Sequence, residues 1–120
     1  MAQKMVVVCN GDEPKNIMPT LVFATSGLAL DYEVHVIFLP TGSKWALKGE
    51  IEKIGTPKGF PNPLKLFNDI LELGGRVVLC EVALENKGIV REDLRDPRII
   101  VQKVPPFLMA ADGAAMTYVF

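Results

Sequence analysis

The chain has 120 residues, with 13 lysines and arginines against 14 aspartates and glutamates, so its formal net charge is -1. This length predicts one domain, residues 1–120, with a core large enough to fold without disulfide staples. Because no basic excess is available to hold a phosphate backbone, the charge argues against a nucleic-acid-binding protein.

Apolar residues make up 49% of the chain, and its mean hydropathy is +0.26. The longest uncharged stretch, residues 16–30, is shorter than the roughly 20 residues that cross a bilayer, so we expect no membrane span. The short apolar run after Lys4 is not long enough for a signal peptide. The apolar excess therefore predicts a sheet covered on both faces, subunit contacts, or both.

Cys9 and Cys80 are the two cysteines, and the chain has a single histidine. Two widely separated cysteines make no disulfide framework, and without a CxxC pair we expect no metal site. This cysteine usage is typical of the reducing cytoplasm, where we expect the protein to work.

The first half of the chain predicts two strands and two helices. Residues 5–9 are an apolar, β-branched run typical of a strand buried on both faces. Asn16 is expected to cap a helix that reaches about Leu30, with Pro19 in its first turn. The next strand is expected at residues 33–39, and a clearly amphipathic helix at residues 63–73.

Three features of this half allow more than one interpretation. The first helix has little polar surface, so it either packs tightly on a small sheet or lies between its sheet and a second subunit. His35 lies inside a predicted strand with no metal-type ligand nearby, and we expect a structural role. Residues 44–63 are rich in glycine and proline, and we expect a mobile excursion that serves as a lid or an assembly element.

The second half continues the alternation of strands and helices. Strands are expected at residues 76–80, 99–104 and 116–120, and helices at residues 81–87 and from Pro105 onward. The pattern predicts an α/β fold: a three-layer α/β/α domain with a mostly parallel five-stranded sheet.

Ligands of such sheets bind at the carboxyl ends of the strands. We therefore expect Cys80 at a functional rim, together with a set of candidate binding residues. This set comprises Cys9, Asn10, Gly11, Thr41, Gly42, Lys44, Trp45 and Pro105.

Cys80 ends the strand predicted at residues 76–80 and directly precedes the helix predicted at residues 81–87. A thiol at a helix N-terminus is favoured as the reactive thiolate, although the neighbouring Glu81 opposes this. The alternative is a small buried apolar residue at a strand end. The position where cysteine-dependent phosphatases place an arginine holds Asn86, and no GxGxxG, GxxxxGK[ST] or GxSxG motif occurs, so we expect no nucleotide cofactor.

Residues 75–89, GRVVLCEVALENKGI, resemble the central motif of the DsrE/DsrF-like sulfur-transfer family. That motif has a glycine, a short apolar strand, one cysteine at the strand end, a short helix and then Gly-Ile. Residues 11–12 with the helix after them, the strand at 32–39, residues 91–94, the turn at 103–105 and the closing residues 115–120 resemble the rest of the family in order.

The resemblance implies a single α/β domain that carries persulfide sulfur on Cys80. Cys80 would take sulfur from a donor, a protein or a small sulfane-sulfur compound, and pass it to an acceptor thiolate. The resemblance also implies a homo-oligomer, a trimer or a hexamer, which would explain the apolar first helix. The chain departs from the family at Val82, Ala83 and Leu84, where other members often have a serine or a second cysteine.

Two questions stay open at this point. Cys9 would resolve a persulfide on Cys80 into a disulfide if strand order brought the two Cα atoms within about 7 Å; otherwise its role is structural. Whether the chain is a sulfurtransferase is also open, since a non-catalytic subunit that binds a small ligand or a partner would use the same fold.

Overall fold

Five parallel strands form the sheet at the centre of the molecule, in the order β4-β3-β2-β1-β5. The structure is a computed structural model that describes residues 2–120. The strands are Lys4–Cys9 (β1), Glu33–Phe38 (β2), Arg76–Cys80 (β3), Ile100–Gln102 (β4) and Met116–Val119 (β5). The α/β class and the parallel sheet are confirmed.

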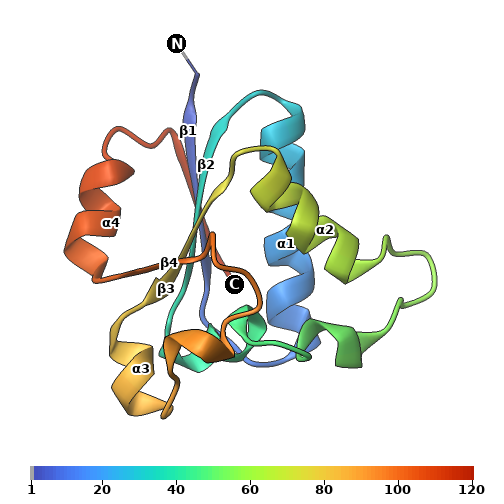
Figure 1. Cartoon of the computed structure of the whole chain (residues 1–120). Coiled ribbons are helices and arrows are strands. Elements are labelled where there is room, and N and C mark those ends of the chain that lie inside the picture. The colour runs from blue at the N-terminus through green and yellow to red at the C-terminus, as the bar shows by residue number, and fades with distance from the viewer. Residues whose placement is uncertain (1) are drawn as a thin grey trace.

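Helices cover both faces of this sheet, as Figure 1 shows. Helices Pro14–Ala29 (α1) and Pro63–Glu72 (α2) lie on one face, and Val104–Ala110 (α4) lies on the other. The short helix Val82–Asn86 (α3) lies beyond the carboxyl end of β3. The predicted three layers are therefore present.

Strand side chains alternate between two cores of unequal size. On β1 and β2, Val7 and Val36 join the larger core beneath α1 and α2. Their neighbours Val6 and Ile37 join the smaller core beneath α4. Residues in strands buried on both sides leave no polar face, which accounts for the continuous apolar runs in the sequence.

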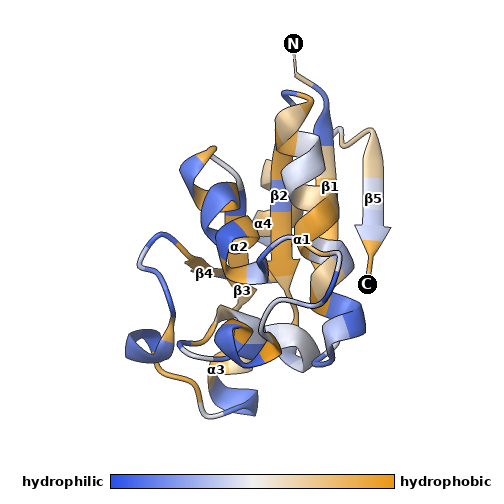
Figure 2. Cartoon of the chain, turned by 90° about the vertical axis from the view of Figure 1, so that its right-hand side faces the viewer, coloured by the Kyte–Doolittle hydropathy of each residue, from blue (hydrophilic) through white to orange (hydrophobic). Residues whose placement is uncertain are grey.

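Helix α1 begins before the residue that we predicted as its cap. Glu13 is the N-cap, and the Asn16 side chain accepts a hydrogen bond from the Glu13 backbone N–H at 3.1 Å. Pro14 explains the earlier start, because its fixed φ suits the first helical position. Pro19 therefore lies inside the helix rather than in its first turn, and Figure 2 shows how little hydrophilic surface α1 carries compared with α2.

Residues 44–54 are not the excursion that we predicted. Two 3-10 helices, Pro40–Ala46 and Ile51–Ile54, carry this segment against the larger core. Trp45 and Ile51 are at most 2% exposed, and the indole Nε1–H of Trp45 donates to the Gly11 carbonyl at 2.9 Å. Only the part from Gly55 to Asn62 forms a largely exposed loop.

The fourth strand is shorter than predicted. β4 ends at Gln102, and Val104 already belongs to α4, because the prolines that follow it suit a first helical turn. Across residues 2–120, no helix combines the length and the apolar character that crossing a bilayer requires.

Replacing Phe67 by alanine is expected to destabilise the fold strongly. The Phe67 ring is 1% exposed, stacks on Phe38 at a centroid distance of 6.1 Å and lies under the Arg95 guanidinium at 5.2 Å. The cavity left behind should lower the free energy of unfolding in urea by about 3–5 kcal/mol. The control Leu73→Ala, at a side chain that is 62% exposed, should cost less than about 1 kcal/mol. Equal losses in the two variants would contradict this packing.

Candidate functional site

The carboxyl ends of β3 and β4 diverge around a cavity. Cys80 pairs with Gln102 in the parallel register, and the Glu81 N–H donates to the Gln102 carbonyl at 3.0 Å. Beyond that bond, one strand turns into α3 and the other into α4. The divergence opens a cavity of about 690 Å³.

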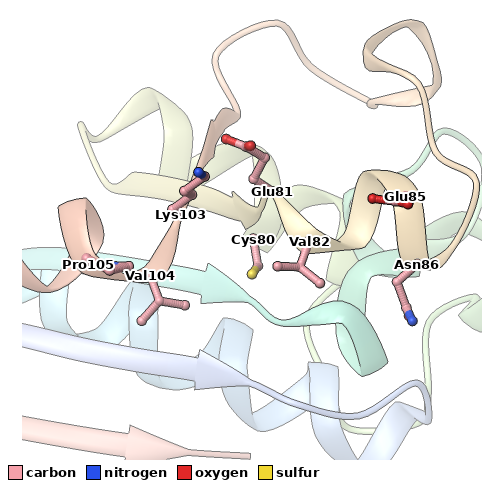
Figure 3. Close-up of a pocket in the computed structure, with 8 residues that line it drawn as sticks. All are labelled: Cys80, Glu81, Val82, Glu85, Asn86, Lys103, Val104 and Pro105. Carbon is pink, nitrogen blue, oxygen red and sulfur yellow. The ribbon is translucent and has the colours of Figure 1, made fainter.

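Both strand ends supply the walls of this cavity, as Figure 3 shows. From the end of β3 and from α3 come Cys80, Glu81, Val82, Glu85 and Asn86. From the start of α4 and the residue before it come Lys103, Val104 and Pro105.

The thiol of Cys80 lies in the apolar part of the cavity wall. Its sulfur points into the space between Val82 and Val104 (Figure 3). Only 3% of Cys80 is exposed, and the residue belongs to the smaller core with Phe107 and Ala111. A reagent therefore reaches this sulfur through the cavity.

Helix α3 contributes less to the electrostatics than the sequence suggested. It has five residues, and its N-cap, Glu81, makes no side-chain capping bond. So few aligned peptide dipoles add up to a small macrodipole. The formal charges at the cavity are the carboxylates of Glu81 and Glu85 and the ammonium of Lys103. Within residues 2–120, no group of three His, Cys, Asp or Glu side chains is placed to hold a metal ion.

Most of the predicted binding residues lie elsewhere on the rim. Pro105 is the one member of that set that lines the cavity with Cys80. Cys9, Gly11, Gly42 and Trp45 are buried together at the carboxyl end of β1. A Cβ atom on Gly42 would come within 2.5 Å of the Cys9 carbonyl oxygen, so this group is packed too tightly to admit a ligand.

The remaining predicted residues line no part of the cavity. Asn10 and Thr41 are exposed. The Lys44 ammonium lies over the Trp45 ring, 4.6 Å from its centroid. None of the three reaches the Cys80 cavity.

The two cysteines are kept apart by the sheet. Cys9 pairs with Phe38, which pairs in turn with Leu79, so β2 separates the two cysteine strands. At about 4.8 Å per strand, the two Cα atoms are on the order of 10 Å apart, beyond the limit for a disulfide. Cys9 also faces the larger core and Cys80 the smaller one, on opposite faces of the sheet. This fold does not allow Cys9 to resolve a persulfide on Cys80.

His35 has structural contacts. Its ring is 3% exposed, bonds the Glu33 carboxylate through Nε2 at 2.7 Å and meets the Phe107 ring edge-on at 6.2 Å. His35 pairs with Arg76, the first residue of β3. It therefore lies near the amino ends of the strands and not at the carboxyl rim where Cys80 lies.

Sequence reasoning missed Val82, Glu85 and Asn86. Glu81, Lys103 and Val104 lie at the predicted strand ends of the rim, but they were not among the candidate binding residues. One signal was present: two predicted strands follow each other in the chain, each leads directly into a helix, and such strands usually pair. We expected the rim but did not predict which strand ends face each other.

Comparison with known proteins gives concordant results. The model of the DsrE/DsrF-like family matches residues 3–112. The uncharacterized protein MJ0760 of Methanocaldococcus jannaschii is 30% identical over 77 residues, which are 64% of this chain and 28% of that protein's length. The chain thus spans under a third of this relative.

Two solved structures share the fold over nearly the whole chain. The ychN protein of E. coli superposes with a TM-score of 0.75 at 18% identity, covering 98% of this chain and 99% of its own. MTH1491 of Methanobacterium thermoautotrophicum, a protein of unknown function, superposes with a TM-score of 0.71 at 14% identity, covering 95% and 96%.

The burial of Cys9 predicts a loss of stability at alkaline pH. Burial raises the pKa of this thiol, and the Thr20 hydroxyl and the Gly11 backbone offset only part of the rise. A raised pKa in the folded state stabilises the fold below the unfolded thiol's pKa of about 8.5, and this contribution is lost as the pH rises toward the folded value. The free energy of unfolding in urea should therefore fall more steeply between about pH 8 and pH 10 in the wild type than in Cys9→Ala. Parallel curves would contradict the prediction.

Proposed function

This chain belongs to the DsrE/DsrF-like family, a family of the sulfur-relay type, and on that premise we propose that it carries sulfane sulfur as a persulfide on Cys80. One observation carries the proposal. Cys80 lines a cavity at the carboxyl rim of the sheet, whereas Cys9 is fully buried in the larger core.

The proposed reaction is two successive thiol exchanges with no net oxidation. The Cys80 thiolate attacks the outer sulfur of a donor persulfide, the donor's S–S bond breaks, and the donor leaves as a thiolate. An acceptor thiolate then attacks the outer sulfur of the Cys80 persulfide, and Cys80 leaves as a thiolate. The buried sulfur stands in a cavity of about 690 Å³, which has room for the added sulfur atom.

The outer sulfur of the Cys80 persulfide must be transferred to a different molecule. With Cys9 on the opposite face of the sheet, the chain has no second thiol in reach of Cys80. The proposed partners are therefore a sulfane-sulfur donor and a thiol acceptor, each a protein or a small compound. Two free cysteines accord with work in the reducing cytoplasm.

We also propose that residues 1–120 act as one DsrE/DsrF-like domain within a homo-oligomer, a trimer or hexamer. An apolar groove of about 460 Å³ beside α1 supports this, because Phe23 and Phe60 are 36% and 49% exposed there. Burying such a patch is favourable by roughly 25 cal/mol per Å².

A second candidate function rests on a different feature. An apolar groove of about 420 Å³ runs between α4 and the sheet, lined by Ile37, Leu39 and Phe107 among others. A subunit that binds an apolar ligand or partner would use this groove without any thiol chemistry, so its binding would survive Cys80→Ser.

Mass spectrometry of the intact protein tests the sulfur-carrier proposal. After incubation with a small organic persulfide, the wild type should gain the mass of sulfur, and a reductant should remove it. Cys80→Ser should show no gain, because its hydroxyl cannot hold a persulfide. The matched variant Cys9→Ser should behave as the wild type does.

Either of two results would overturn this assignment: an adduct that persists in Cys80→Ser, or one that is lost in Cys9→Ser while circular dichroism shows a folded chain. An absence of any adduct on the wild type would favour the apolar-groove function.

The oligomer proposal predicts that Phe60→Asp lowers the molar mass measured by light scattering after gel filtration. A carboxylate in a buried apolar contact is costly, so the subunits should separate. Met109→Asp is the control, since this side chain is 78% exposed on α4, which covers the other face of the sheet. An unchanged mass in Phe60→Asp, or an equal drop in both variants, would contradict the assignment of the α1 groove as the contact.

A further inference from the structure

The cavity around Cys80 carries an excess of negative charge. Two of its lining residues, Glu81 and Glu85, are acidic, and one, Lys103, is basic. All three are exposed. In the part of the chain that the structure describes, neither carboxylate forms an ion pair within 4 Å of a lysine or arginine. Neither carboxylate is therefore held in a close ion pair, and the formal charges of Glu81, Glu85 and Lys103 sum to one negative charge.

The residues that carry these charges belong to the lining of the cavity through which the sulfur is reached. Cys80 is 3% exposed, so a reacting molecule enters the cavity before it meets the thiol. The walls next to the sulfur are apolar, with Val82 60% exposed and Val104 opposite it (Figure 3). Apolar walls of low dielectric strengthen the action of charges on a molecule inside a cleft.

We propose that Glu81 and Glu85 make the Cys80 cavity selective for sulfur donors and acceptors that carry an uncharged or cationic group beside the reacting sulfur, and against small donors that carry additional negative charge. This inference rests on the proposed sulfur-carrier function of Cys80 and names its substrate class. A donor of this class is an organic persulfide or a protein segment with a lysine or arginine beside its sulfur, and thiosulfate, with two negative charges, is the disfavoured extreme.

Charge selection at Cys80 is measurable without sulfur transfer. Methanethiosulfonate reagents react when a thiolate attacks the sulfur that carries the variable group, which forms a mixed disulfide and expels methanesulfinate. No external oxidant or reductant is consumed. The trimethylammonioethyl and sulfonatoethyl reagents place a positive or a negative charge on similar frames.

The experiment measures the labelling rates of both reagents on Cys80 in a Cys9→Ser background, at low ionic strength. The labelling rate of the cationic reagent is divided by that of the anionic reagent, and the result is divided by the same ratio for β-mercaptoethanol. We expect a value of roughly three to ten, the effect of one net negative charge in a site partly screened by solvent. Glu81→Gln/Glu85→Gln should bring the ratio close to that of β-mercaptoethanol, and Lys103→Gln should raise it. High salt should weaken the effect in the wild type.

The proposal is overturned if the wild-type ratio is no higher than that of β-mercaptoethanol, or if the double variant leaves it unchanged. It is equally overturned if neither reagent reaches Cys80, because selection requires entry through the cavity. Failure of the proposed function looks different: charge-selective labelling would persist in a protein that gains no sulfur from persulfide donors.

Discussion

The pairing of β3 with β4 determines where Cys80 lies and where the cavity opens. Cys80 stands opposite Gln102, and one more backbone bond, from Glu81 to Gln102, closes the ladder before the two strands separate. After this bond, β3 leads into α3 and β4 leads into α4. The two chain segments therefore separate and no longer pair with each other, which leaves a space between them. The cavity is the direct result of this divergence, and the thiol lies in its wall.

The period of two along each strand gives the cysteines separate environments. Cys9 faces the larger core, where Gly42 and Trp45 close over the end of β1 and burial keeps its thiol protonated to higher pH. Cys80 faces the smaller core and the cavity. A chain arranged this way has one thiol that lines the cavity, so in the proposed relay a sulfur atom on Cys80 moves on only by transfer to a second molecule.

The sequence predicts a feature when residues close together in the chain determine it, and fails when contacts between distant residues do. Strand and helix positions came from periodicity, and the rim position of Cys80 came from the end of an apolar run before a helical one. The burial of Trp45 was not predictable, because a tertiary bond to the Gly11 carbonyl decides it against a local excess of glycine and proline. Which residues face Cys80 depends on strand order, and that order comes from packing across the whole sheet.

The measurement that tests the central claim most directly is cyanolysis of the loaded protein. The chain is incubated with an organic persulfide, freed of donor by gel filtration and treated with cyanide, which takes up sulfane sulfur as thiocyanate. The account predicts about one thiocyanate for each wild-type chain and none from Cys80→Ser, in line with a single cavity-lining thiol. Equal thiocyanate from both proteins would contradict it.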